Sequence, residues 1–284
     1  VDHGEALGVV GESGCGKSTA ARVVLRLIEA DRGRIAFDGE DVLAASPARM
    51  RVLRRRMQIV FQDPASALDP RQRIGAALAE PLAVHGIAKG AAARDRVAAV
   101  LDEVGLPATA AQRFPHEFSG GQRQRIGIAR ALALAPDLII ADEPVSALDV
   151  SVQAQILLLL AELKKRRRLA FVFVSHDLGV VRYFCERTVV MYLGRIIESG
   201  PTGALFDAPK HPYTQLLRGA SPVPDPEAPK RVLIPEGEPP SPIDPPPGCH
   251  FNPRCPLATS VCREIAPALR DMGAGRTVAC HHAT

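Results

Sequence analysis

Short apolar runs alternate with longer mixed segments along the first 205 residues. Residues 7–10, 138–141 and 171–174 are mostly aliphatic or aromatic, and each run ends where polar residues begin. Short apolar runs of this kind are typical of strands buried on both faces of a parallel sheet. Between the runs, apolar side chains such as Val97, Leu101 and Val104 recur at helical spacing. The pattern predicts an α/β fold with a mostly parallel sheet.

The pattern also predicts how the chain divides into domains. Residues 1–205 carry the strand and helix alternation, and residues 75–134 within them are Ala-rich and helical, without a convincing strand, so we interpret them as a helical insertion. Eleven prolines then fall between residues 222 and 247, where helices and central strands are both disfavoured. We therefore expect a separate C-terminal domain at residues 206–284.

Composition excludes several classes of protein. The 284 residues include 35 Lys and Arg against 31 Asp and Glu, a net charge of +4 that is too mild for dedicated nucleic-acid binding. With 46% hydrophobic and 23% charged residues, the chain is not disordered throughout. It has neither an apolar run of about 18 residues that would span a bilayer nor a signal-peptide pattern. We expect a cytosolic protein.

A phosphate-binding loop follows the first apolar run. Residues 11–18 read Gly-Glu-Ser-Gly-Cys-Gly-Lys-Ser, between a strand-like run and a helical stretch at residues 20–28, which fits Gly-x-x-x-x-Gly-Lys-Ser/Thr. The glycines let backbone N–H groups surround a phosphate, Lys17 reaches the β- and γ-phosphates, and the Ser18 hydroxyl ligates magnesium. Thr19 starts the helix. We interpret Cys15 as a small loop residue, with a reactive thiol as the alternative.

Two carboxylates and a second helix start complete the chemistry that the residues themselves indicate. Asp142 and Glu143 end a buried strand, where α/β sheets hold ligands, so we expect Asp142 to hold magnesium through water and Glu143 to polarise the attacking water or accept its proton. Residues 119–122, Ser-Gly-Gly-Gln, begin a predicted helix at about 123–134 and form a second anion-binding helix terminus.

Together these motifs resemble the nucleotide-binding subunits of ABC transporters, in which ATP lies between the phosphate loop of one subunit and the signature segment of another. The resemblance implies that Gln62 is in the Q-loop that touches magnesium and faces the membrane subunits, that Asp149 is in the D-loop of the dimer interface, and that His176 contacts the γ-phosphate. It gives Lys17, Gln62, Glu143 and His176 the catalytic roles. It implies nucleotide binding by Gly11, Glu12, Ser13, Gly14, Cys15, Gly16, Lys17, Ser18, Thr19, Gln62, Ser119, Gly120, Gly121, Gln122, Asp142 and Asp149.

Further segments resemble the dipeptide and oligopeptide importer branch, which nickel and glutathione importers share. They are residues 61–71, 115–118, 211–214, 237–242, 248–251 and 254–256. The resemblance implies a second, homologous ATPase subunit, two membrane permease subunits and an extracytoplasmic solute-binding protein, with this chain at the cytoplasmic face of the bacterial inner membrane. The expected function is ATP hydrolysis that drives peptide import, with nickel or glutathione as the alternative cargo.

One feature of that family has no counterpart here. The family carries an aromatic residue upstream of the phosphate loop that stacks on adenine, and the ten residues before Gly11 include none. This favours a fragment or the second half of a fused polypeptide, with weaker adenine binding. A soluble ABC-type ATPase acting on DNA or ribosomes is the rival class, but it would carry coiled-coil or zinc-hook insertions or two linked ATPase units. A regulatory domain without turnover is disfavoured because the catalytic side chains are all present.

Four of the six cysteines lie in the last 36 residues, Cys249, Cys255, Cys262 and Cys280. Stable disulfides are disfavoured in a reducing cytosol, and the segment has few apolar residues for a core of its own, so we interpret the cluster as a metal site. The spacing lacks the close pairs typical of zinc, which favours a four-iron four-sulfur cluster. Zinc and uncoordinated thiols remain alternatives, as does a ligand from His250, His281 or His282.

Overall fold

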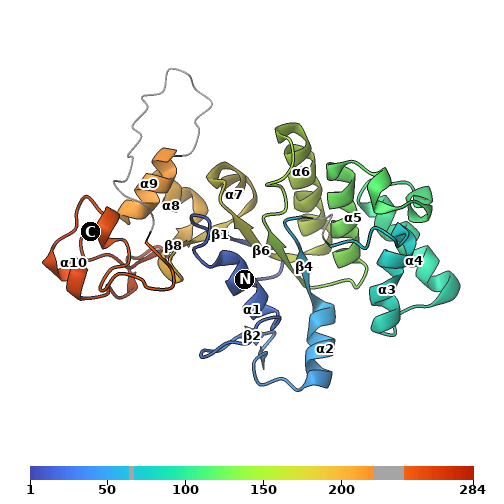
Figure 1. Cartoon of the computed structure of the whole chain (residues 1–284), viewed down its shortest axis with the longest axis horizontal. Helices are drawn as coiled ribbons and strands as arrows, with labels where there is room; N and C mark the ends of the chain where they lie inside the picture. Colours follow the sequence, from blue (N-terminus) through green and yellow to red (C-terminus); the bar gives the residue numbers. More distant parts are fainter. Residues whose placement is uncertain (64–66, 221–239) are drawn as a thin grey trace. The chain divides into compact units, whose positions relative to one another are not determined.

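The computed structural model describes residues 1–63, 67–220 and 240–284 (Figure 1). Residues 64–66, next to the Q-loop, and residues 221–239, which include most of the proline-rich stretch and residues 237–239 of one importer-like segment, lie outside the described residues. The chain forms two compact units. The first unit comprises Val1–Glu5 and Thr19–Val172, and the second comprises Ala6–Ser18 and Phe173–Thr284.

Strands and helices alternate along the described chain. In order, the elements are β1 (Ala6–Val10), α1 (Lys17–Val24), β2 (Ala36–Phe37), β3 (Glu40–Asp41), α2 (Pro47–Arg56), β4 (Met57–Val60), α3 (Ile74–Val84), α4 (Gly90–Glu103), η1 (Ala108–Gln112), η2 (Pro115–Glu117), α5 (Gly120–Leu132), β5 (Leu138–Asp142), α6 (Val150–Arg167), β6 (Ala170–Ser175), α7 (Leu178–Phe184), β7 (Arg187–Tyr192), β8 (Arg195–Pro201), α8 (Thr202–Asp207), α9 (Pro212–Ala220), η3 (Asn252–Arg254), α10 (Ser260–Glu264), β9 (Arg270–Asp271) and β10 (Thr277–Val278).

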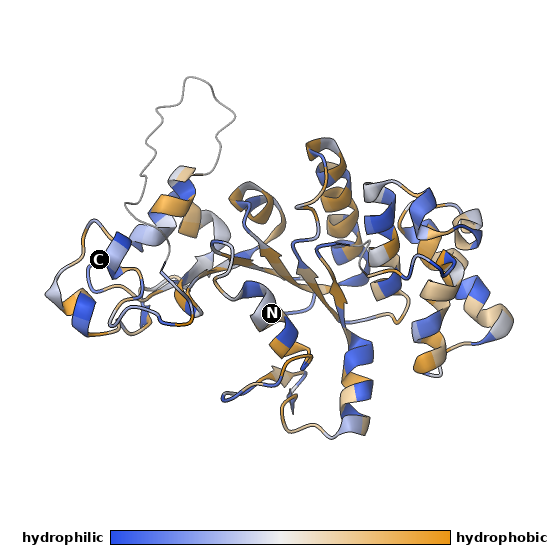
Figure 2. Ribbon diagram, in the orientation of Figure 1, coloured by the Kyte–Doolittle hydropathy of each residue, from blue (hydrophilic) through white to orange (hydrophobic). Residues whose placement is uncertain are grey.

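The first unit joins a parallel strand pair to a group of helices. β4 and β5 pair in parallel, with Met57 opposite Leu138, and β5 is buried along its whole length. Residues 74–132, all of them described, contain helical elements only, and α3, α4 and α5 lie side by side (Figure 1). Val97 and Leu101 are buried on α4, as their spacing predicts. The strands carry mostly hydrophobic side chains, whereas the helices carry both kinds (Figure 2).

The second unit contains the strand that leads into the phosphate loop. β1 pairs in parallel with β7, and β7 pairs antiparallel with β8. Near the C-terminus, β10 adds to the other edge of β8, with Thr277 opposite Ser199. The apolar runs at residues 7–10, 138–141 and 171–174 therefore lie in strands β1, β5 and β6.

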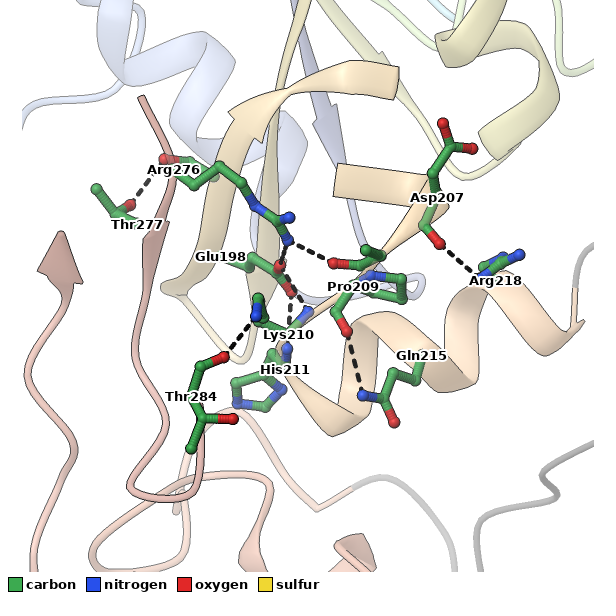
Figure 3. Close-up of polar contacts among 12 residues, drawn as sticks. Glu198, Asp207, Pro209, Lys210, His211, Gln215, Arg218, Arg276, Thr277 and Thr284 are labelled. Atoms are coloured by element: carbon green, nitrogen blue, oxygen red, sulfur yellow. Dashed lines mark hydrogen bonds and ion pairs between the residues drawn. The ribbon is translucent and has the colours of Figure 1, made fainter. Parts of the chain in front are cut away.

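A buried carboxylate attaches the C-terminal residues to β8. Glu198 is fully buried and accepts the backbone N–H groups of Lys210 and His211 at 2.9 Å each. Arg276 donates to the same carboxylate at 2.9 Å (Figure 3). Because a buried carboxylate needs hydrogen bonds to replace water, these three donors fix β8, the start of α9 and the chain before β10 together.

Aromatic rings form the core where the C-terminal residues join the second unit. The Phe251 ring meets Tyr192 and Tyr213 edge-on, with centroids 5.3 and 5.4 Å apart, and all three side chains are almost fully buried. Edge-to-face pairs of this kind add to the free energy gained by burial. A segment that is poor in apolar residues thus completes its core with rings from β7 and α9.

Candidate functional site

The phosphate loop joins β1 to α1 with the strand, loop and helix order that its sequence predicts. Lys17, the first residue of α1, is only 5% exposed. Its amine donates to the carbonyl oxygens of Gly11 and Glu12 at 2.8 and 2.9 Å. The loop therefore bends back around its own lysine, whose amine is bonded to two loop carbonyls at the start of the helix.

Glycine is required at two positions of this loop. A Cβ at Gly11 would collide with the Met191 carbonyl oxygen. Gly16 has a φ of +101°, a conformation that residues with a side chain rarely adopt. The sequence motif is therefore a backbone requirement of this turn. Cys15, 4% exposed, lies within the loop, and burial raises the pKa of its thiol, which keeps the thiol protonated.

The rest of the second unit holds the loop from outside. Gly194 donates its N–H to the Cys15 carbonyl at 2.9 Å, and the Glu12 N–H donates to the Tyr213 hydroxyl at 2.8 Å. Arg254 donates to both carboxylate oxygens of Glu12, at 2.8 and 3.0 Å. Sequence reasoning gave Tyr213 and Arg254 no role, because no spacing rule connects residues about 200 and 242 positions away to a loop.

His176 follows β6 in the same unit. Its side chain is exposed, and α7 begins two residues later with Asp177 as its N-cap. The Asp177 carboxylate accepts the N–H groups of Gly179 and Val180 at 2.8 and 3.1 Å. The cap fixes where the helix starts, and so fixes the backbone that carries the histidine.

The first unit carries the two carboxylates at the end of β5. Asp142 is 3% exposed, and Glu143 has a φ of +47°, a left-handed conformation that is uncommon for a residue with a side chain. Gln62 donates from Nε2 to Glu143 Oε2 at 3.2 Å. The structure thus brings together the Q-loop glutamine and the expected general base, as the sequence motifs imply. Backbone strain of this kind is concentrated at functional sites.

The signature segment caps its own helix. Ser119 is the N-cap of α5, and its hydroxyl accepts the Gln122 N–H at 3.3 Å while the Gln122 side chain accepts the Ser119 N–H at 3.1 Å. This reciprocal pair is a capping box. Both side chains are exposed at the helix start. The helix begins at Gly120, three residues before the predicted start.

The D-loop packs against this helix start. Gly120 lies close to Leu148, and a Cβ at Gly121 would collide with the Val152 side chain near the start of α6. Asp149 is the exposed residue before α6. The two signature glycines therefore allow α5 to approach the D-loop closely. The first unit brings these two sequence motifs together.

Of the four C-terminal cysteines, Cys262 and Cys280 are buried and Cys249 and Cys255 are half-buried. Burial raises the pKa of the Cys249 and Cys255 thiols, and repulsion between neighbouring thiolates raises it further. The Cys262 sulfur lies 3.4 Å from His282 Nε2. In the described residues the cysteines form no disulfide, and no group of three or more His, Cys, Asp or Glu side chains is arranged to hold a metal ion.

The histidines near the cysteines have other contacts. His250 Nδ1 lies 3.2 Å from the Leu193 carbonyl, and His281 Nε2 lies 2.9 Å from the Ile265 carbonyl. Within the residues that the structure describes, no helix has the length and apolar character needed to cross a bilayer.

Known proteins resemble the chain along nearly its whole length. Residues 1–146 match the family described as ABC transporter, and residues 197–262 match the oligopeptide/dipeptide transporter C-terminal region. The chain is 49% identical to the di/tripeptide transport ATP-binding protein DppF of Pseudomonas aeruginosa, over 100% of this chain and 87% of the relative. It is 52% identical to a protein of Brucella ovis named as a peptide import ATP-binding protein, over 99% of this chain and 88% of the relative.

Solved structures agree with these matches. The structure of cbiO1 from Clostridium perfringens, part of the ABC transporter complex cbiONQ, superposes with a TM-score of 0.65 at 30% identity, covering 72% of this chain and 80% of that one. A dimeric ATP-binding cassette in a post-hydrolysis state with ADP and phosphate gives 0.64 at 31% identity, over 71% and 87%. The chain has the α/β fold of P-loop NTPases and belongs to the ABC transporter family, as one of its ATP-hydrolysing subunits.

Proposed function

We propose that this chain drives the import of di- and oligopeptides by binding and hydrolysing ATP. The proposal rests on one observation above all: the same chain matches the ABC transporter family at residues 1–146 and the oligopeptide/dipeptide transporter C-terminal region at residues 197–262. The names of its relatives point to the same cargo class. We divide it functionally into an ATPase domain at 1–205, with a helical subdomain at 75–134, and a C-terminal domain at 206–284.

Nucleotide binding is assigned to the phosphate loop and its partners. The N–H groups of residues 11–19 and the Lys17 amine hold the β- and γ-phosphates, which the tight glycine turn and the buried lysine support. Ser119, Gly120, Gly121 and Gln122 bind the phosphates of a nucleotide held by a second subunit, across an interface that Asp149 joins. The exposed, capped start of α5 supports that role.

Hydrolysis is assigned to side chains at strand ends. Ser18, Gln62 and Asp142 hold Mg²⁺, for which hydroxyl, amide and carboxylate oxygens are suitable ligands. Bound Mg²⁺ neutralises charge on the phosphates. Glu143 orients the attacking water and accepts its proton, Gln62 restrains the Glu143 carboxylate, and His176 contacts the γ-phosphate.

The chain acts as part of a larger assembly. We infer that it pairs with a homologous ATPase subunit, or with a second copy of itself, beneath two membrane permease subunits, and that a solute-binding protein delivers the cargo from outside. It lies at the cytoplasmic face of the cell membrane and binds no nucleic acid. The match to a subunit of a transporter complex and to a dimeric cassette supports this assembly.

The cysteine cluster is proposed to hold a four-iron four-sulfur cluster. Its support is that Cys249, Cys255, Cys262 and Cys280 all fall in the last 36 residues, and that the Cys249 N–H donates to the Cys262 carbonyl at 2.8 Å. In the described residues no group of three or more His, Cys, Asp or Glu side chains is arranged to hold a metal ion, so the geometry supports neither the cluster nor the zinc alternative. Absorbance near 400 nm with stoichiometric iron would support the cluster, whereas a protein without iron or that absorbance would refute it.

The test of function is magnesium-dependent ATP hydrolysis by the protein reconstituted with its permease subunits. We expect a peptide-loaded binding protein to stimulate hydrolysis and expect Lys17→Ala to abolish it. The exposed Lys89→Ala variant, matched in side chain and far along the sequence from the loop, serves as the control. Stimulation by nickel or glutathione instead of peptide would change the cargo, and a response to DNA or ribosomes alone would refute transport.

A further inference from the structure

Arg254, from the C-terminal part of the chain, makes a two-bond contact with the phosphate loop. Its two terminal nitrogens donate to the two oxygens of Glu12 at 2.8 and 3.0 Å. The Arg254 side chain is 5% exposed and that of Glu12 is 28% exposed. A bidentate ion pair of this kind is stronger and more directional than an exposed ion pair with a single hydrogen bond.

The arginine is itself held in place. It ends the short turn η3, in which the Asn252 side chain donates to the carbonyls of Pro247 and Cys249, both at 2.9 Å. The Tyr192 hydroxyl lies 3.4 Å from the arginine, and the Phe251 ring lies beneath it. These contacts surround the guanidinium that donates to Glu12.

A second contact holds the backbone of the same glutamate. The Glu12 N–H donates to the Tyr213 hydroxyl at 2.8 Å, and the Tyr213 side chain is fully buried. Tyr213 and Arg254 lie on either side of the segment 221–239 in sequence, and Phe251 packs against Tyr213. One residue of the phosphate loop is thus fixed through both its main chain and its side chain by the C-terminal third of the protein.

The charge of Glu12 explains why such a contact matters. A carboxylate within a loop that binds a triphosphate repels the phosphate oxygens unless a cation compensates for it. Arg254 supplies that cation through two hydrogen bonds to the carboxylate. We propose that Arg254 is a positioning residue for nucleotide binding, through which the C-terminal region sets the affinity of the phosphate loop for MgATP. This inference rests on the proposed ATP site.

The experiment measures kcat and KM for MgATP in the reconstituted transporter. For Arg254→Met we expect KM to rise about tenfold, within the range of typical couplings between sites, with a much smaller change in kcat. The double variant Glu12→Gln/Arg254→Met removes the unpaired carboxylate and should return KM to within about threefold of the wild-type value. Arg254→Lys keeps the positive charge but cannot donate the paired hydrogen bonds of a guanidinium, so it should restore KM only in part.

Arg276→Gln is the matched control, because it also removes an arginine of the C-terminal region, 11% exposed, from a carboxylate. Glu198 keeps two backbone donors there, so the variant should lower the melting temperature without raising KM. An unchanged KM in a folded Arg254→Met protein would overturn the inference, as would a KM raised equally by Arg276→Gln or not lowered in the double variant. A wild-type protein that binds no MgATP would instead refute the proposed ATP site.

Discussion

The two proposed phosphate-binding helix starts are stabilised in opposite ways. The start of α5 is capped by its own residues, Ser119 and Gln122, three positions apart. The phosphate loop before α1 depends on Gly194, Tyr213 and Arg254, which are far away in sequence. A helix start that is capped by its own residues keeps its conformation when the surrounding elements move. A loop that is held by distant residues changes its conformation when those residues move or are substituted.

The largest expected effect is on the rate of ATP hydrolysis. Glu143→Gln removes the proposed base of the first unit and leaves the phosphate loop of the second unit intact. We expect kcat to fall about 100- to 10,000-fold while MgATP remains bound, measured by phosphate release and by nucleotide retention. The exposed Glu162→Gln serves as the control. Unchanged turnover would remove Glu143 from its role.

The distant support of the phosphate loop should also be sensitive to acid. His211 accepts the Tyr213 N–H at Nδ1, and burial lowers its pKa from 6.5 to about 4. Because the unfolded histidine takes up a proton near pH 6.5 and the folded one only near pH 4, the unfolded state binds more protons between these values. Stability is complete above pH 6.5 and is lost as the pH falls, by about 3 kcal/mol at full protonation.

That loss should disappear in His211→Asn, whose side-chain oxygen can accept the same N–H. Denaturant unfolding at pH 7 and pH 4 measures the difference, with the exposed His3→Asn as the control that retains it. An equal acid loss in the His211→Asn and wild-type proteins would contradict the buried, neutral histidine.

Disturbing the close approach of α5 to the D-loop should have a smaller effect, on the free energy of unfolding. Gly121→Ala places a methyl group against the stiff Val152 side chain and should cost about 2 kcal/mol of unfolding free energy. Adding Val152→Ala provides the missing space. The double variant should therefore be more stable than the sum of the two single changes, as measured by a double-mutant cycle. Simple additivity would show that the two helices do not constrain each other.

Removing the cap of α5 should have the smallest effect on the free energy of unfolding. Ser119→Ala should cost about 1 kcal/mol, because the Gln122 N–H loses its acceptor, whereas Ser119→Asp should retain most of the stability. Urea unfolding of the three proteins measures both values. If alanine and aspartate behave alike, the capping box does not stabilise α5.

The features that sequence predicts well are those set by nearby residues. The parallel α/β fold, strands β1, β5 and β6, and the helix after Ser119 all depend on short patterns, and the fold is confirmed. The helix after the phosphate loop begins and ends earlier than the predicted residues 20–28: α1 spans Lys17–Val24, and Arg26 adopts a left-handed conformation with a φ of +51°. Apolar residues at 27 and 28 continue the pattern but remain exposed.

Contacts between distant residues were beyond prediction for a physical reason. The hydrogen bond between Gln62 and Glu143 joins two recognisable motifs, so the family resemblance anticipated that both serve one site. Arg254 and Glu12 are 242 positions apart, and no sequence motif or periodicity connects them. Only the folded chain brings them together. The roles of the individual site residues stay predictions until the variants are measured.

The contact between Glu12 and Arg254 sets a rule for exchanging parts between related transport ATPases. A chimera that takes its last third from a relative inherits a new partner for the glutamate of the phosphate loop. Where the donor lacks an arginine at the position of Arg254, the graft leaves an uncompensated carboxylate in the proposed nucleotide-binding loop. Positions 12 and 254 therefore have to be transplanted as a pair, although the boundary of the graft lies between them.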